Sequence, residues 1–167
     1  MQQQAAGYRG EGFSLRGEKD RFVLPPLFRK AWAELGDDRI LCVAKHHSLP
    51  CLRGFGMSRT QGFNQILDRD EANAVQRGLP YDRERIATKM WTFAEVPFDA
   101  SGRFILPERY CKVGGIGENI CFLGGGEFIT LWDLDRLGQM GEDWADQYEL
   151  CLASADEARS KAGGKGK

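Results

Sequence analysis

The chain has 167 residues, 42% of them hydrophobic and 28% charged, which is an ordinary globular mixture and enough for one domain or two small ones. Its formal net charge of −1 argues against a strongly basic nucleic-acid-binding domain. No apolar run approaches the roughly 18 residues that cross a bilayer, and no basic flank precedes an apolar segment at the N-terminus, so we expect a cytoplasmic protein without membrane contacts.

Charge is unevenly distributed along the chain. Residues 1–85 hold 14 Lys and Arg against 11 Asp and Glu, whereas residues 86–167 hold 9 against 13. Because local charge rather than the total sets the potential at a surface, an anionic partner is expected to contact the first half.

The first predicted element is an apolar strand over residues 12–15, followed by a charged turn and a second short strand, RFVL, over residues 21–24. Pro25 then opens a helix that is expected to run to residue 35, because the first turn of a helix does not need the N–H that proline lacks. Gly36 suits the left-handed residue that ends many helices. A hairpin follows, with ILCVA and LPCLRGF as strands on either side of a KHHS turn.

Residues 56–90 are charged and mostly helical in pattern. One helix is expected to continue through residues 68–75 and to end near the Gly-Leu-Pro at 78–80, and a second short helix covers residues 82–90. We interpret this segment as a linker.

The elements of residues 91–133 repeat those that precede the linker. An apolar strand over residues 94–98 leads through a turn into RFIL, a proline follows, and NICFLG and FITLWD form a hairpin. The sequence Arg-Phe-(aliphatic)-Leu-Pro therefore occurs twice, at residues 21–25 and 103–107, and the copies start about 82 residues apart. Each copy is about 40 residues long, too short to bury a core alone, so the two must pair.

The last predicted element is a helix over residues 134–161, interrupted near Gly138 and Gly141. Apolar side chains recur in it at helical spacing, which indicates core packing or an oligomer contact. These are Leu134, Leu137, Trp144, Tyr148, Cys151 and Leu152. The glycine- and lysine-rich residues 162–167 are expected to be disordered.

These elements predict an α+β fold, mainly β, made from two tandem strand-helix-hairpin repeats with flanking helices. The two repeats are expected to fold against each other as the halves of a barrel. The predicted segments are a first repeat, a helical linker, a second repeat, a C-terminal helix and a disordered tail, at residues 8–55, 56–90, 91–133, 134–161 and 162–167.

The cysteines are odd in number and irregular in spacing, and several lie within apolar runs. This pattern favours reduced, buried thiols over disulfides. The five are Cys42, Cys51, Cys111, Cys121 and Cys151.

The stretch VPFDASGRFILPERY resembles the Asp-x-x-Gly-Arg signature of the SpoVT-AbrB superfamily, and two such units joined by a charged helical linker resemble the MraZ family of bacterial transcriptional regulators. The resemblance spans residues 8–144. It implies a pseudo-twofold, swapped-hairpin (AbrB-like) barrel, ring-shaped homo-oligomers and a nucleoid-associated repressor of the division and cell wall gene cluster. The implied partner is double-stranded DNA with repeated promoter boxes, and no cofactor, small-molecule substrate or enzymatic activity is expected.

The motif residues of the second repeat are Asp99, Gly102 and Arg103. Asp99 can accept backbone N–H bonds within its own turn and Gly102 can take a positive φ, so we interpret both as turn-shaping residues. Arg103 can bind a carboxylate or a phosphate with its forked guanidinium, which leaves an internal ion pair and a DNA contact both open.

The first repeat departs from this pattern, because Gly17 stands where the second repeat has its aspartate and Asp20 stands where it has its glycine. Asp20 tolerates a left-handed backbone better than most residues, so the turn can survive without its carboxylate anchor. Basic side chains on a strand and turn can enter a groove of DNA or follow its phosphates, although a solvated charged turn is the alternative. The expected DNA-binding residues are Arg9, Arg16, Lys19, Arg21 and Arg103.

Other site types fit less well. Two cysteines and two histidines could be imagined as zinc ligands, but their spacing matches no usual zinc finger, and strand alternation would point the histidines to opposite sides. A cysteine hydrolase would need a histidine beside a nucleophilic cysteine, and no cysteine of this chain lies within a known nucleophile motif. The glycines of GGIGENICFLGGGE lack the Gly-Lys-Ser/Thr of a phosphate loop. The zinc ligands considered are Cys42, His46, His47 and Cys51, and no metal site is expected.

The serious alternative to a DNA-binding regulator is a non-enzymatic structural protein that forms a ring without binding specific DNA. The same barrel and the same amphipathic C-terminal helix would serve either function. Retention on a DNA or heparin column distinguishes the two.

Overall fold

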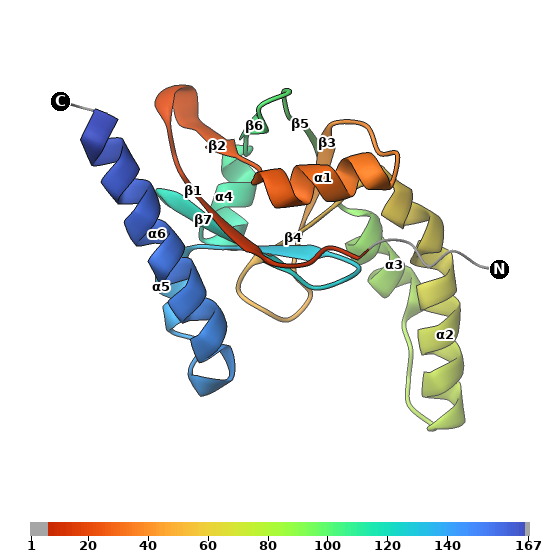
Figure 1. Cartoon of the computed structure of the whole chain (residues 1–167). Coiled ribbons are helices and arrows are strands. Elements are labelled where there is room, and N and C mark those ends of the chain that lie inside the picture. Colours follow the sequence, from red (N-terminus) through yellow and green to blue (C-terminus); the bar gives the residue numbers. More distant parts are fainter. Residues whose placement is uncertain (1–6, 166–167) are drawn as a thin grey trace.

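The computed structural model describes residues 7–165. They form a six-stranded antiparallel sheet with strand order β1-β7-β8-β4-β3-β5 and a separate two-stranded antiparallel ribbon of β2 and β6 (Figure 1). The strands of the sheet are β1 Glu11–Leu15, β3 Ile40–Lys45, β4 Leu52–Phe55, β5 Ala94–Pro97, β7 Asn119–Gly124 and β8 Ile129–Trp132. The strands of the ribbon are β2 Arg21–Val23 and β6 Arg103–Ile105.

The two repeats exchange their first strands. Strand β1 of the first repeat pairs with β7 of the second, and β5 of the second repeat pairs with β3 of the first. The hairpins β3–β4 and β7–β8 meet through β4 and β8. The strand order therefore has a twofold symmetry. If each strand is replaced by its counterpart in the other repeat, the same order results, read from the opposite edge of the sheet. Neither repeat completes its part of the sheet alone, as their small size requires.

The main sheet is open, so the expected closed barrel is wrong. Strands β1 and β5 are its edges, and no ladder joins them within residues 7–165. A barrel closes only when hydrogen-bonded strands continue around its full circumference. Here β2 and β6, each three residues long, pair with each other, and the step from β1 to β2 is made by a side-chain bond from Val23 N to Ser14 Oγ (2.8 Å). The α+β class is confirmed, and the strands are antiparallel, but helices cover more of residues 7–165 than strands do, so the expectation of a mainly β fold is wrong.

Helices flank the sheet. Helix α1 lies over the sheet, α6 packs against β1, and α2 and α3 project at the opposite end of the molecule (Figure 1). The helices are α1 Pro26–Glu34, α2 Phe63–Gln76, α3 Arg83–Trp91, α4 Glu108–Gly114, α5 Leu134–Gly138 and α6 Ala145–Lys165. Three short 3-10 helices are η1 Glu18–Asp20, η2 Met57–Gly62 and η3 Glu142–Trp144.

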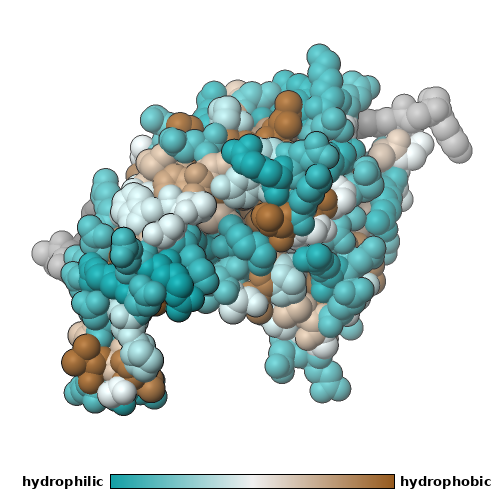
Figure 2. Space-filling model, turned by 180° about the vertical axis from the view of Figure 1, so that it is seen from behind, coloured by the Kyte–Doolittle hydropathy of each residue, from teal (hydrophilic) through white to brown (hydrophobic). Residues whose placement is uncertain are grey.

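Local signals account for several helix ends. Helix α1 begins one residue after Pro25, and Gly36 beyond its end has a φ of 71°, as predicted. Helix α3 begins after Asp82, whose carboxylate accepts a hydrogen bond from Arg85 N at 3.1 Å. The tip of the α2–α3 pair projects from the body of the molecule, at lower left in Figure 2, and apolar side chains are exposed there, including Val75 and Leu79.

The C-terminal helix is interrupted where the glycines predicted it. Helix α5 ends at Gly138, and α6 begins only after η3. Helix α6 continues to Lys165 and so includes residues 162–165, which were expected to belong to the disordered tail. Residues 166 and 167 lie outside the described residues.

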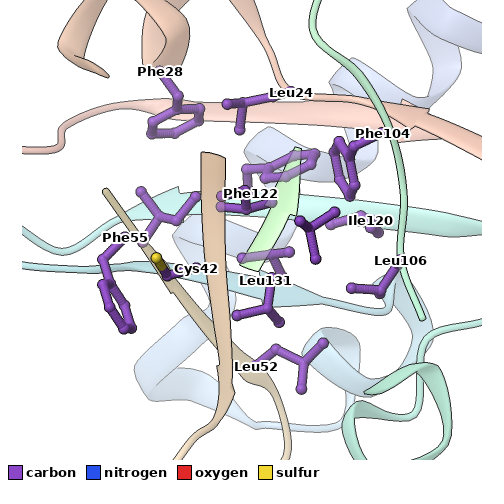
Figure 3. Packing of buried hydrophobic residues seen from close by; sticks show 14 of the residues in the cluster. Leu24, Phe28, Cys42, Leu52, Phe55, Phe104, Leu106, Ile120, Phe122 and Leu131 are labelled. Carbon is purple, nitrogen blue, oxygen red and sulfur yellow. The ribbon is translucent and has the colours of Figure 1, made fainter. Parts of the chain in front are cut away.

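The main core joins the two repeats through aromatic side chains. Phe22 and Phe104 occupy equivalent positions in the two repeats, and their ring centroids lie 6.0 Å apart. Phe104 also contacts Phe122 of β7 at 6.4 Å, and Phe122 contacts Phe28 of α1 at 6.1 Å. Figure 3 shows Phe28, Phe104 and Phe122 above Leu131 of β8 and Leu52 of β4. Strands and helices of both repeats therefore share one core.

A second core lies beneath α6, where Cys151 and Ala155 pack with buried residues of β7 and β8. Leu152 is 36% exposed and does not belong to the buried face, contrary to the predicted stripe. Successive residues of a helix point about 100° apart, so Ala155, one turn after Cys151, takes the inward position instead. All five cysteines are free and buried, as predicted.

Candidate nucleic-acid interface

The turn of the second repeat is organised by Asp99. Its Oδ1 accepts hydrogen bonds from Ser101 N (3.0 Å) and Arg103 N (2.9 Å), and its Oδ2 accepts one from Arg103 Nε (2.7 Å). The backbone N–H of Arg103, its side chain and the N–H of Ser101 hold the pKa of Asp99 below its usual value. The Asp99 side chain therefore closes the turn and orients Arg103.

Gly102 lets this turn contact the first repeat. It has a φ of 86°, and a Cβ atom there would lie 2.6 Å from the carbonyl oxygen of Leu24. Leu24 N donates to Gly102 O at 2.8 Å, and Arg29 Nη1 donates to Ala100 O at 3.2 Å. Both the backbone angle and the close approach require glycine at this position.

The turn of the first repeat keeps the closing backbone hydrogen bond of the second repeat, with different residues and a different backbone conformation at Lys19. Gly17 N donates to Arg21 O (2.8 Å), which matches the bond from Asp99 N to Arg103 O (3.1 Å) in the second repeat. Lys19 and Asp20 are both left-handed, with φ values of 59° and 58°. The carboxylate anchor is missing, and Arg21 Nε instead donates to Glu18 O at 3.4 Å. The turn thus survives, with two residues in a conformation that side chains disfavour.

The Arg16 side chain makes its contacts within the protein. Its Nε and Nη2 donate to Gly117 O at 3.1 and 2.9 Å, and its guanidinium lies 4.9 Å from the centre of the Phe22 ring. An ion pair with Asp20 at 3.8 Å adds a contact within the turn. Its side chain is 21% exposed. Arg16 therefore joins the first turn to the loop before β7 of the second repeat.

Arg9 does not lie with the other candidates. It precedes β1, next to Gly10, whose carbonyl accepts a hydrogen bond from Gly124 N at 2.8 Å. The turn at residues 16–21 follows the other end of β1. At about 3.3 Å per residue, the length of β1 places Arg9 on the order of 20 Å from the turn.

The ribbon brings Arg21 and Arg103 onto one surface. Arg21 lies opposite Ile105 and Val23 lies opposite Arg103, while Phe22 and Phe104 form the central pair. Because side chains alternate across a strand, both phenylalanines face the core and the four flanking residues face outward. Ile105 is 57% exposed. We call the outward residues the ribbon face: Arg21, Val23, Arg103 and Ile105.

Lys19 is exposed on the turn next to the ribbon face. Of the five expected DNA-binding residues, Lys19, Arg21 and Arg103 therefore lie in one region. Val23 and Ile105 were not expected there, although the alternation in RFVL and RFIL indicates that they face away from the two phenylalanines.

The two histidines do not point to opposite sides, and that expectation is wrong. Strand β3 ends at Lys45, so His46 and His47 lie in the turn, where their rings stack at 4.3 Å. His46 Nδ1 accepts hydrogen bonds from Ser48 N and Leu49 N at 3.1 and 3.0 Å. Burial, followed by the neighbouring His47, lowers the pKa of His46 to about 4. Within the described part of the chain, no cluster of three or more His, Cys, Asp or Glu side chains could hold a metal ion.

None of the helices in residues 7–165 is long and apolar enough to span a membrane.

No family model matches the chain. The protein named "Transcriptional regulator MraZ" of Rickettsia felis (strain ATCC VR-1525 / URRWXCal2) is 30% identical over 147 residues, which cover 83% of this chain and 91% of that protein. The protein of the same name from Rickettsia rickettsii (strain Sheila Smith) is 30% identical over 146 residues, with the same coverage. The one from Parvibaculum lavamentivorans (strain DS-1 / DSM 13023 / NCIMB 13966) is 25% identical over 129 residues, which cover 75% of each chain.

Proposed function

The chain belongs to the MraZ family of transcriptional regulators, and from this premise we propose that it binds double-stranded promoter DNA through the β2–β6 ribbon. The observation that carries the proposal is the ribbon face, where two arginines from different repeats flank two exposed aliphatic side chains. No catalytic role is assigned to any residue.

The ribbon face suits the major groove of DNA. A two-stranded antiparallel ribbon fits that groove, arginine binds the O6 and N7 atoms of guanine, and apolar side chains contact the methyl group of thymine. An arginine held at Nε by a carboxylate still has two terminal amino groups to donate. Asp99 therefore positions Arg103 for base contact, while Lys19 on the adjoining turn is placed for a phosphate.

We extend the proposal to the assembly. A single ribbon neutralises few phosphates, and the chain carries a net charge of −1, so one subunit should bind weakly. Several copies in a homo-oligomeric ring would engage repeated promoter boxes together, which raises the effective concentration of each later contact. Occupied boxes would exclude RNA polymerase, which makes the protein a repressor of the division and cell wall gene cluster at the nucleoid.

We also propose that the fold is the swapped-hairpin, AbrB-like arrangement in an open form. Its support is the exchange of β1 and β5 between repeats and the strand order that is unchanged when the repeats are exchanged. In this arrangement each repeat contributes its first strand to the other repeat and β2 pairs with β6, so the DNA-binding face depends on both repeats.

A second candidate function is a structural assembly protein without specific DNA binding. The exposed apolar side chains at the projecting tip of α2 favour a contact with another protein (Figure 2). Equal, weak binding to promoter and scrambled DNA would select this function over the first.

The test compares binding of the duplex upstream of the gene with a scrambled duplex at several salt concentrations. Arg21→Gln removes one ribbon-face charge and should weaken promoter binding by about tenfold, the value of one arginine–guanine contact. Arg69→Gln removes the same charge from an exposed position on α2 and should change affinity less than about twofold. Unchanged promoter binding by a folded Arg21→Gln variant would reject the ribbon face as the DNA contact.

A further inference from the structure

Arg53 is a buried charge that no carboxylate neutralises among the described residues. It lies on β4 and is 7% exposed, and its guanidinium lies 5.0 Å from the centre of the Phe128 ring. Its Nε makes no hydrogen bond, and no carboxylate pairs with it among the side chains that the structure describes. Burial lowers the pKa of Arg53. Burying an uncompensated charge costs free energy. An anion bound next to the Arg53 guanidinium would offset that cost.

Arg53 lines a cleft of about 1040 Å³. The residues that line the cleft come from the β3–β4 turn and from helices α2, α3 and α4, among others. Its volume is in the range of sites for small organic molecules, which are concave and mostly apolar with a few polar anchors. None of the residues of the ribbon face lines it.

The walls of the cleft are strongly positive. Five cationic side chains line it against two carboxylates, a local excess of three positive charges in a chain whose net charge is −1. The cations come from β3, β4, α3 and α4, and are Lys45, Arg53, Arg85, Lys89 and Arg109. After burial, the positive charges of Arg53, Lys89 and Lys45 are what lower the pKa of His47. Cations from three elements thus act together at His47. The concave shape of the cleft strengthens their combined field.

The rest of the lining is apolar, from Ile66, Ile86, Met90, Tyr110, Val113 and Phe128. We propose that this cleft binds a small organic anion, a carboxylate or phosphate ester with an apolar body, whose charged group pairs with Arg53. The apolar body packs against α3, α4 and the Phe128 ring, and Lys89 and Lys45 contribute attraction at the entrance.

A small ligand fits Arg53 better than the two alternative occupants do. A DNA phosphate belongs to a wide, stiff duplex, whereas the guanidinium of Arg53 is only 7% exposed and is more accessible to a small anion. An acidic segment of a second copy, such as the exposed carboxylates of α6, would have to bring a helix roughly 10–12 Å across to the same half-hidden group.

The test uses anilinonaphthalene sulfonate, a fluorescent probe with an apolar aromatic body and one sulfonate, and the uncharged phenylnaphthylamine as its matched control. We expect one site per chain for the sulfonate and affinity at least about tenfold weaker for the uncharged probe, because the latter lacks the charged hydrogen bond. Equal affinities would overturn the proposal.

Two variants locate the site. Arg53→Met should weaken sulfonate binding by about tenfold or more while thermal stability is unchanged or raised, because it replaces a buried charge that no carboxylate neutralises with a shorter apolar chain. Lys89→Gln, at an exposed cleft position, should weaken binding by about threefold, and Lys161→Gln on α6 should leave it unchanged. If Arg53→Met does not fold, Lys89→Gln and NMR shifts of Phe128 and Tyr110 on titration decide the question.

The alternative occupants predict different results. If a second copy fills the cleft, Lys89→Gln will lower the mass of the assembly in sedimentation, and the probe will dissociate it. If DNA uses the cleft, promoter duplex will displace the probe and Lys89→Gln will weaken DNA binding as much as Arg21→Gln does. Either result overturns the proposal, which expects assembly mass and DNA affinity to be unaffected by Lys89→Gln.

Discussion

Asp20 has a left-handed backbone (φ 58°) at the position where the second repeat has Gly102 (φ 86°). Its side chain makes an ion pair with Arg16 at 3.8 Å but is 75% exposed, so the pair contributes little. Asp20→Gly should therefore raise the free energy of unfolding by up to about 1 kcal/mol, because glycine adopts this angle without steric cost. Urea unfolding measures the change.

The matched control for Asp20→Gly is Asp38→Gly, an exposed aspartate with a negative φ. At that position glycine only increases the conformational entropy of the unfolded chain, so the free energy of unfolding should fall by about 0.5–1 kcal/mol. Equal losses in the two variants would mean that the left-handed turn is not strained.

Gly102 is constrained by its φ and also by its neighbour, since an added Cβ would lie 2.6 Å from Leu24 O. Gly126 has nearly the same φ (87°) with nothing within 4 Å of an added Cβ. Gly126→Ala should cost about 1 kcal/mol for the backbone angle alone, and Gly102→Ala about 2 kcal/mol or more. Denaturant unfolding of both variants separates the two effects. Similar losses would show that the turn can move away from Leu24.

At the scale of elements, α6 presents one face to β1 and the second core. Ala155 is fully buried and Leu152 is 36% exposed, although they are only three positions apart. Ala155→Asp should lower the free energy of unfolding by about 3 kcal/mol, because it buries an unpaired charge. Leu152→Asp should change it by less than about 0.5 kcal/mol. Urea unfolding distinguishes them, and a large loss in Leu152→Asp would indicate that α6 uses that face in an oligomer contact.

The helices and strands differ in how far the sequence predicts them. Prolines, capping residues and glycines act within a few positions, so the starts of α1 and α3 and the break before α6 followed from local signals. The contact of Arg16 with Gly117 joins residues 101 positions apart, and the open sheet depends on how β2 pairs. Long-range pairing of this kind leaves no local signal. The cleft around Arg53 was missed for the same reason, since its cations come from separate segments.

At the scale of the whole molecule, weak single contacts must add up if the protein is to occupy a promoter. Each subunit offers one ribbon face, and the folding of both repeats is needed to form it. The geometry of an assembly would then set the distance between ribbon faces, and the spacing of DNA boxes would have to match it. Affinity should depend on box number and box phase rather than on a single sequence element.

A duplex with two correctly spaced boxes should bind at least about tenfold more tightly than a duplex with one, and the slope of log affinity against log salt should be about twice as steep. Moving one box by about 5 base pairs should remove most of the gain, because it rotates that box by half a turn of the DNA. Fluorescence anisotropy over a salt series measures both quantities. Lys19→Gln serves as the internal reference, since loss of one phosphate contact per subunit should make the salt slope shallower by about one for each subunit bound. Identical affinity and slope for one and two boxes would show that a single subunit binds alone, and the proposed role of the assembly would then be wrong.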